Sequence, residues 1–83
     1  MGRARRLRHL TKTDAEAISK RVLRSMGDKA RGRFVAIDMA TGEPHVGDST
    51  LAAVEQGLRA APGARFFIHR LGYPVAATLK HSR

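Results

Sequence analysis

Residues 33–50, RFVAIDMATGEPHVGDST, decide the fold. Five of the six residues in 34–39 are apolar, which is typical of a strand covered on both faces. Residues 40–43 have turn chemistry, because Gly42 can adopt a positive φ. Pro44 begins a short return strand and places it at a sheet edge, since proline has no N–H to donate to a neighbouring strand.

A helix follows this hairpin, with Asp48 or Ser49 as its N-cap, and it is predicted to run to about residue 60. Leu51, Val54 and Leu58 recur at helical spacing and are expected to face the sheet. Gly57 costs about 1 kcal/mol inside a helix, and a close approach to the sheet is the expected compensation.

Two further strands are predicted, at residues 66–71 and 75–79, with a turn at 72–74 between them. Because a helix separates strands 34–39 and 66–71, we expect these two to be parallel through a crossover connection. Strand 75–79 would then return antiparallel.

A basic arm and a helix precede the hairpin. Thr13 and Glu16 have the spacing of a capping box, which predicts a helix over about 14–26 with Ala15 and Ile18 on its apolar face. Residues 1–12 contain no acidic residue and are predicted to be a flexible arm.

The predicted fold class is therefore α+β, a single small domain with the order α-β-β-α-β-β. Its mixed four-stranded sheet carries a helix on one face. The arm is residues 1–12 and the domain is residues 13–83, with the core at 32–80. The second face of the sheet must be covered by helix 14–26, by a second copy of the chain or by a partner, and an apolar face left open would be an interaction site.

The charge is unevenly placed. The chain of 83 residues carries a net charge of +9, and residues 1–33 account for +8 of it. Such an asymmetry indicates a polyanionic partner, or else a solubilising tail. The basic side chains that could contact nucleic-acid phosphates are Arg3, Arg5, Arg6, Arg8, Lys12, Lys20, Arg21 and Arg24.

Several classes of site find no support. The chain has no cysteine, which excludes disulfides and thiolate zinc sites, and its histidines are not spaced as a local metal pair. No apolar run approaches the roughly 20 residues of a membrane span, and no secretory signal is recognisable. We expect no cofactor, no metal, no small-molecule substrate and a cytoplasmic location. A mitochondrial targeting peptide is a weaker alternative, because the arm contains no serine.

An enzyme is a third hypothesis with a narrow basis. Asp38, Glu43, His45 and Asp48 cluster around one hairpin and could form an acid–base or divalent-ion site, of which an enzyme would use Asp38, His45 and Asp48. Each acidic residue also has a simpler interpretation, Asp38 at a strand end, Glu43 in a turn and Asp48 as a helix cap, so we predict no catalytic residues.

Parts of residues 32–74 resemble a known group of proteins. The matching segments are Gly32-x-Phe-Val-Ala-Ile-Asp38, Thr41-Gly42-Glu43, Val46-Gly47-Asp48 and Arg70-Leu71-Gly72-Tyr73. This pattern, G-x-[YF]-V-A-I-D … G-E … R-x-G-Y, resembles small bacterial proteins of unknown function. The resemblance covers about half of the chain and implies a small partner protein encoded beside toxin-like or retropepsin-like genes, with an antitoxin-like role. The basic N-terminal region is a departure from those proteins, and the resemblance implies no catalytic residues.

Two functions remain as the main predictions. The first is a non-enzymatic basic binding module that contacts nucleic-acid phosphates through its arm and first helix. The second is a protein-interaction or antitoxin-like module with an incidental basic tail, for which a protein partner or a homodimer is expected.

Overall fold

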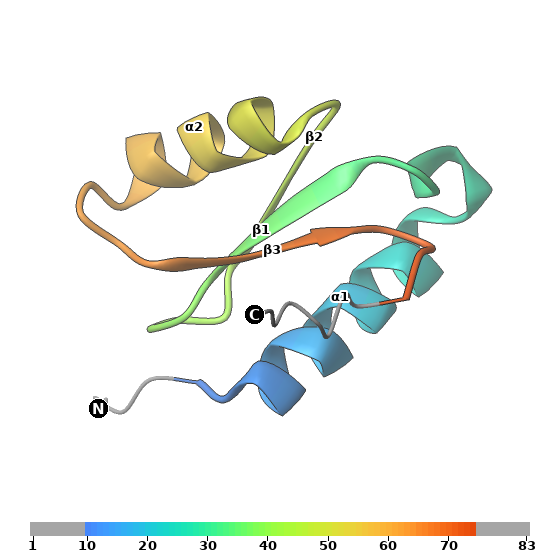
Figure 1. Cartoon of the computed structure of the whole chain (residues 1–83), viewed down its shortest axis with the longest axis horizontal. Coiled ribbons are helices and arrows are strands. Elements are labelled where there is room, and N and C mark those ends of the chain that lie inside the picture. Colours follow the sequence, from blue (N-terminus) through green and yellow to red (C-terminus); the bar gives the residue numbers. More distant parts are fainter. Residues whose placement is uncertain (1–9, 75–83) are drawn as a thin grey trace, which may run out of the picture.

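The computed structural model describes residues 10–74, which form three layers with a sheet between two helices (Figure 1). The elements are α1 (Lys12–Met26), a short 3-10 helix η1 (Asp28–Ala30), β1 (Phe34–Asp38), β2 (Pro44–Gly47), α2 (Thr50–Ala60) and β3 (Phe66–Arg70). The strand order is β2-β1-β3, with α1 below the sheet and α2 above it in Figure 1.

The prediction of a mixed four-stranded sheet is wrong. Within residues 10–74 the sheet has three strands, and β1 is antiparallel to both of its neighbours. The expected parallel pairing of β1 and β3 ignored the reversal at the hairpin. Since β2 runs opposite to β1, the crossover through α2 makes β3 parallel to β2, and β1 lies between the two. The strand predicted at 75–79 lies outside the described residues.

The register divides the sheet into two apolar faces. Val35 pairs with Val46 and His69, while Ala36 pairs with His45 and Ile68. Because successive residues of a strand point to opposite faces, these two rows face α1 and α2 respectively. The fully buried cluster under α1 consists of Ala15, Ala30, Val35, Ile37 and Leu71. Helix α1 of the same chain thus covers the second face of the sheet, for which the sequence allowed a helix, a second copy of the chain or a partner.

Helix α1 starts two residues earlier than the sequence pattern suggested. Its N-cap is Thr11, whose side chain accepts from the Asp14 N–H while the Asp14 carboxylate accepts from the Thr11 N–H. The capping box at Thr13 and Glu16 was therefore wrong by two residues. The Leu10 N–H donates to the Met39 carbonyl at 2.7 Å, which ties the start of the helix to the sheet and favours the earlier cap.

Helix α2 presents a different face to the sheet from the one predicted. Its buried residues are Ala53 and Gly57, whereas Leu51 is 66% exposed and Leu58 is 41% exposed. The close approach expected at Gly57 is confirmed, because a Cβ built there would lie 2.5 Å from Cε1 of Phe66. So close a helix leaves room only for small residues beneath it, which is why the leucines lie outside.

Candidate nucleic-acid interface

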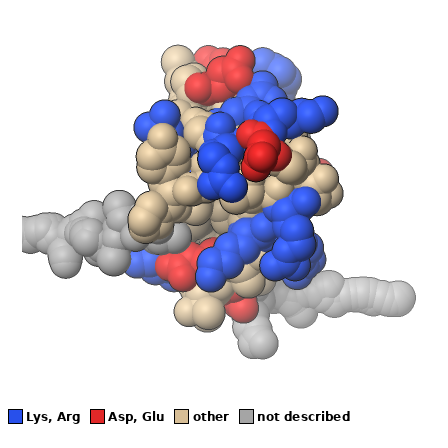
Figure 2. All heavy atoms as spheres, turned by 90° about the vertical axis from the view of Figure 1, so that its right-hand side faces the viewer, with Lys and Arg blue, Asp and Glu red and all other residues tan. Residues whose placement is uncertain are grey.

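Basic residues from distant parts of the chain meet at one end of the sheet, where β1 begins and β3 ends. The Gly32 N–H donates to the Leu71 carbonyl, and the Leu71 N–H donates to the Arg33 carbonyl, both at 2.7 Å. Because β1 and β3 are antiparallel, this pairing brings Arg31 and Arg33 beside Arg70. We call the side chains of Arg31, Arg33, Arg70 and Tyr73 the basic end. Figure 2 views this end of the molecule, where Lys and Arg side chains occupy much of the surface, with Asp and Glu side chains among them.

Arg70 contacts two aromatic rings. Its guanidinium carbon lies 4.3 Å from the Tyr73 ring centroid and 5.6 Å from that of Phe34, and both contacts are of the cation–π type. Its Nε donates to the Gly32 carbonyl at 3.1 Å. No carboxylate of residues 10–74 forms an ion pair with it. The charge of Arg70 is therefore fixed in position by neutral groups.

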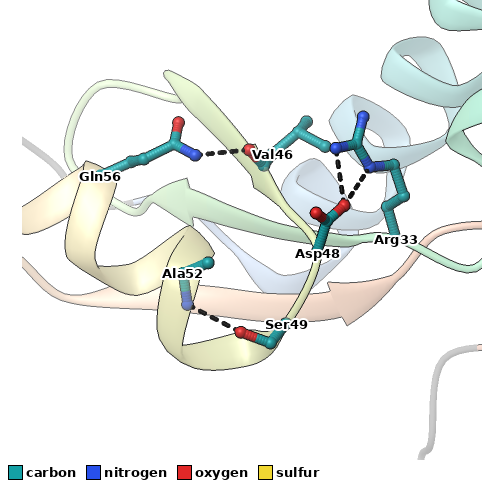
Figure 3. Close-up of polar contacts among 6 residues, drawn as sticks. All are labelled: Arg33, Val46, Asp48, Ser49, Ala52 and Gln56. Carbon is teal, nitrogen blue, oxygen red and sulfur yellow. Dashed lines mark hydrogen bonds and ion pairs between the residues drawn. The ribbon is translucent and has the colours of Figure 1, made fainter.

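The other two arginines of the basic end have acidic partners that lie in solvent. Arg33 binds one Asp48 carboxylate oxygen through Nε at 2.9 Å and Nη2 at 2.7 Å (Figure 3), and the Asp48 side chain is 83% exposed. Arg31 lies 3.6 Å from Asp28, whose side chain is 97% exposed. Exposed ion pairs of this kind contribute about 0–1 kcal/mol, so a phosphate can replace either acid at low cost.

The same close-up shows how α2 and β2 are held beside this end. Ser49 caps α2 by accepting from the Ala52 N–H at 3.1 Å, and the Gln56 side-chain amide donates to the Val46 carbonyl at 2.7 Å (Figure 3). The N-terminus of α2 is thereby fixed next to Asp48 and its arginine.

A cleft of about 370 Å³ opens between α1 and the end of β3. A chain of hydrogen bonds forms its wall, in which the Ser19 hydroxyl bonds Nδ1 of His69, and Nε2 of His69 lies 2.6 Å from the Tyr73 carbonyl oxygen. Because a carbonyl only accepts, Nε2–H is the donor there, and in a neutral ring Nδ1 then accepts from the serine. A serine–histidine contact occurs in nucleophilic catalysis, but Ser19 is only 1% exposed. Its hydrogen bond to His69 instead holds α1 against β3. The lining residues are Glu16, Ser19, Lys20, Leu23, Arg31, His69, Gly72, Tyr73 and Pro74.

The structure brings together three of the predicted phosphate contacts. Lys20, Arg21 and Arg24 are all exposed on α1 and, at 3.6 residues per turn, fall within an arc of about 100° around the helix axis. This arc lies opposite to Ala15 and Ser19, the buried residues of α1, and so points away from the sheet. We call these three residues the cationic arc. Lys20 also lines the cleft, so it joins the cationic arc to the basic end.

The remaining predicted contacts are elsewhere. Lys12 is exposed in the first turn of α1, about 12 Å along the helix from Lys20 at 1.5 Å per residue. Arg3, Arg5, Arg6 and Arg8 lie outside the described residues. Sequence reasoning also missed the four members of the basic end. An antiparallel arrangement of strands 34–38 and 66–70 would have indicated them, since it places the start of one beside the end of the other.

The hairpin residues of the enzyme hypothesis do not form one site. The Asp38 side chain is 3% exposed and accepts from the N–H groups of Ala40 and Thr41, at 2.8 and 3.3 Å, so it stabilises the turn. Asp48 lies at the other end of the sheet, roughly 13 Å away along a strand of this length. His45 lies on the α2 face, edge-on to Phe66 with ring centroids 6.2 Å apart. No cluster of three or more potential metal ligands occurs in the part of the chain that the structure describes.

Comparisons with protein-family models, with curated proteins and with solved structures find no match to this chain. The resemblance of residues 32–74 to small antitoxin-like proteins stays a prediction. No helix within residues 10–74 is long and apolar enough to cross a membrane.

Proposed function

We propose that this chain is a non-enzymatic module that binds nucleic-acid phosphates. One observation carries the proposal. Helix α1 docks on the sheet by its apolar side and so holds Lys20, Arg21 and Arg24 together on an exposed arc. Cationic side chains on a rigid helix match a row of phosphates without the entropy cost of ordering a loose chain.

The distribution of charge supports this proposal. Residues 10–74 contain ten Lys and Arg against seven Asp and Glu, a net charge of +3, while residues 1–9 add four arginines and no acid. Arg3, Arg5, Arg6 and Arg8 therefore add four positive charges to the sequence that precedes α1. Such an excess of positive charge accelerates the approach to a polyanion and makes the affinity fall steeply with salt.

Two double variants of equal charge test the proposal. Arg21→Gln/Arg24→Gln removes two charges from the cationic arc, and Arg59→Gln/Arg65→Gln removes two exposed charges outside it, one in the last turn of α2 and one just before β3. Binding to labelled duplex DNA and RNA is measured over a salt series. We expect the first variant to lower the slope of log affinity against log salt by about 2, and the second to leave it nearly unchanged. Equal effects of the two variants would mean that only net charge matters, and unchanged binding in both would refute the role of α1.

A protein-interaction or antitoxin-like module is the second candidate. The observation that favours it is the outward position of Leu51 and Leu58, which are 66% and 41% exposed and stand two turns apart on α2. Exposed apolar side chains that share one helix side are typical of docking surfaces. Light scattering over a concentration series would test self-association: a dimer that Leu51→Gln/Leu58→Gln converts to a monomer supports this candidate, and a wild-type monomer at all concentrations leaves only a heterologous partner.

A further inference from the structure

We propose that the cleft between α1 and the end of β3 takes one unpaired base of a single-stranded nucleic acid. The base would stack on Tyr73, the neighbouring phosphates would contact Arg31, and Lys20 would add positive charge to the lining. This inference rests on the proposed function and narrows its ligand from nucleic acid in general to single strands.

The size and lining of the cleft suit such a ligand. Its volume of about 370 Å³ lies at the lower end of the range of roughly 300–1,000 Å³ that small-molecule sites occupy. Leu23 and Pro74 supply apolar wall, while Lys20 and Arg31 supply positive charge at the same opening. Flat apolar surface beside cations is the combination that single-strand binders use.

Tyr73 is pre-positioned to stack. One face of its ring is covered by the Arg70 guanidinium at 4.3 Å, yet the residue remains 48% exposed and lines the cleft. Its backbone is fixed at both ends, because its N–H donates to the Arg70 carbonyl at 3.2 Å and its carbonyl accepts from His69 at 2.6 Å. A base that stacks on the ring face away from Arg70 therefore meets a ring that needs no reordering.

The charges at the cleft decide where the phosphates lie. The ion pair of Arg31 is with the highly exposed Asp28, at 3.6 Å, and a phosphate can take over this contact. Glu16, one helical turn before Lys20, also lines the cleft and repels phosphate on that side. The strand should thus pass on the Arg31 side of Tyr73. A duplex keeps its bases stacked inside, so only an unpaired base reaches the cleft.

The experiment uses a built-in probe. Tyr73 is the only tyrosine and the chain has no tryptophan, so the intrinsic fluorescence of the protein comes from this residue. The full chain is titrated with a short oligothymidylate, with an abasic strand of the same length and with a duplex. A free tyrosine derivative titrated in parallel corrects for light absorption by the bases. We expect saturable quenching by the oligothymidylate alone, although all three ligands bind through their phosphates.

Variants at the cleft separate stacking from charge. Binding of labelled strands is followed by fluorescence anisotropy. Tyr73→Leu should weaken oligothymidylate binding by roughly 5-fold to 150-fold and leave abasic-strand binding unchanged, while Tyr73→Phe should retain both. Glu16→Gln should strengthen the binding of both strands, since it removes the negative charge from the cleft.

The outcomes are distinguishable. Equal affinity for the oligothymidylate and the abasic strand, with no quenching of Tyr73, overturns the base-binding cleft and leaves the phosphate-binding module standing. Absence of binding to any of the three ligands at low salt overturns both. If Tyr73→Leu does not fold, as judged by circular dichroism, quenching of the wild-type protein and binding by Tyr73→Phe still decide the question.

Discussion

Gly57→Ala tests the tight contact between α2 and the sheet. In an exposed helix this substitution stabilises by about 1 kcal/mol, because alanine restricts the unfolded chain and favours the helix. Here the new Cβ would lie 2.5 Å from Cε1 and 2.6 Å from Cζ of Phe66, and 3.3 Å from Cδ2 of His45. Overpacking of this kind costs about 1–3 kcal/mol. The two terms together predict a net destabilisation of about 1 kcal/mol, and a melting temperature lower by about 4–8 °C for a domain of this size.

A second substitution isolates the cause of this loss. Phe66→Leu removes the ring atoms that the new Cβ would meet, so Gly57→Ala should become neutral or stabilising in that background. The four proteins of this double-mutant cycle are compared by urea denaturation and thermal melts, with an expected coupling of about 1–2 kcal/mol. The reasoning is refuted if Gly57→Ala stabilises the protein while Phe66 is present, because the helix could then not lie as close to the sheet as the structure has it.

Three smaller perturbations test other contacts by urea denaturation. Ser19→Ala should cost about 1–3 kcal/mol, since it leaves a ring nitrogen of its partly buried partner His69 without this hydrogen bond. Ser25→Ala on the exposed side of the same helix should cost almost nothing, and similar losses in the two variants would contradict the role of the Ser19–His69 bond in holding α1 to β3. Thr11→Ala should lower the stability by about 1 kcal/mol because it removes the N-cap of α1, and Thr13→Ala should lower it much less. A larger loss for Thr13→Ala would show that the helix starts at Thr13 instead. Leu51→Gln should change stability by no more than about 0.5 kcal/mol, against the 2–5 kcal/mol expected for a buried leucine, so a large loss would place this side chain in the core.

Local patterns predicted most of the elements of this fold. The strand at 34–38, the return strand that begins at Pro44 and both helices follow from an apolar run, turn residues and helical periodicity, which depend only on neighbours in sequence. The direction of β3 could not be predicted from such local patterns, because it depends on how many times the chain reverses direction between β1 and β3. The rotation of α2 was missed for another reason: Ala53 and Gly57 also stand one turn apart, and close packing selected this small pair rather than the larger leucines.

The candidate site divides in the same way. The cationic arc on α1 could be predicted, because helical periodicity places Lys20, Arg21 and Arg24 on one side as soon as the apolar side is known. The basic end could not, since it joins residues nearly forty positions apart through the register of β1 with β3. From the sequence, Tyr73 could be recognised as one of only four aromatic residues and as part of a family-like motif, but its contact with Arg70 depends on the turn after β3.

The contact between Gln56 and the Val46 carbonyl also bears on the solubility of the protein. β2 is an edge strand, and a bare edge offers N–H and C=O groups that can recruit strands from other molecules into aggregates. Pro44 has no N–H to offer, and two residues further on the side chain of Gln56 occupies a carbonyl at 2.7 Å. The β2 edge of this small sheet is thus protected against pairing with strands of other molecules, because Pro44 lacks an N–H donor and the Val46 carbonyl is already bonded. This protection needs no charged residue in β2 itself.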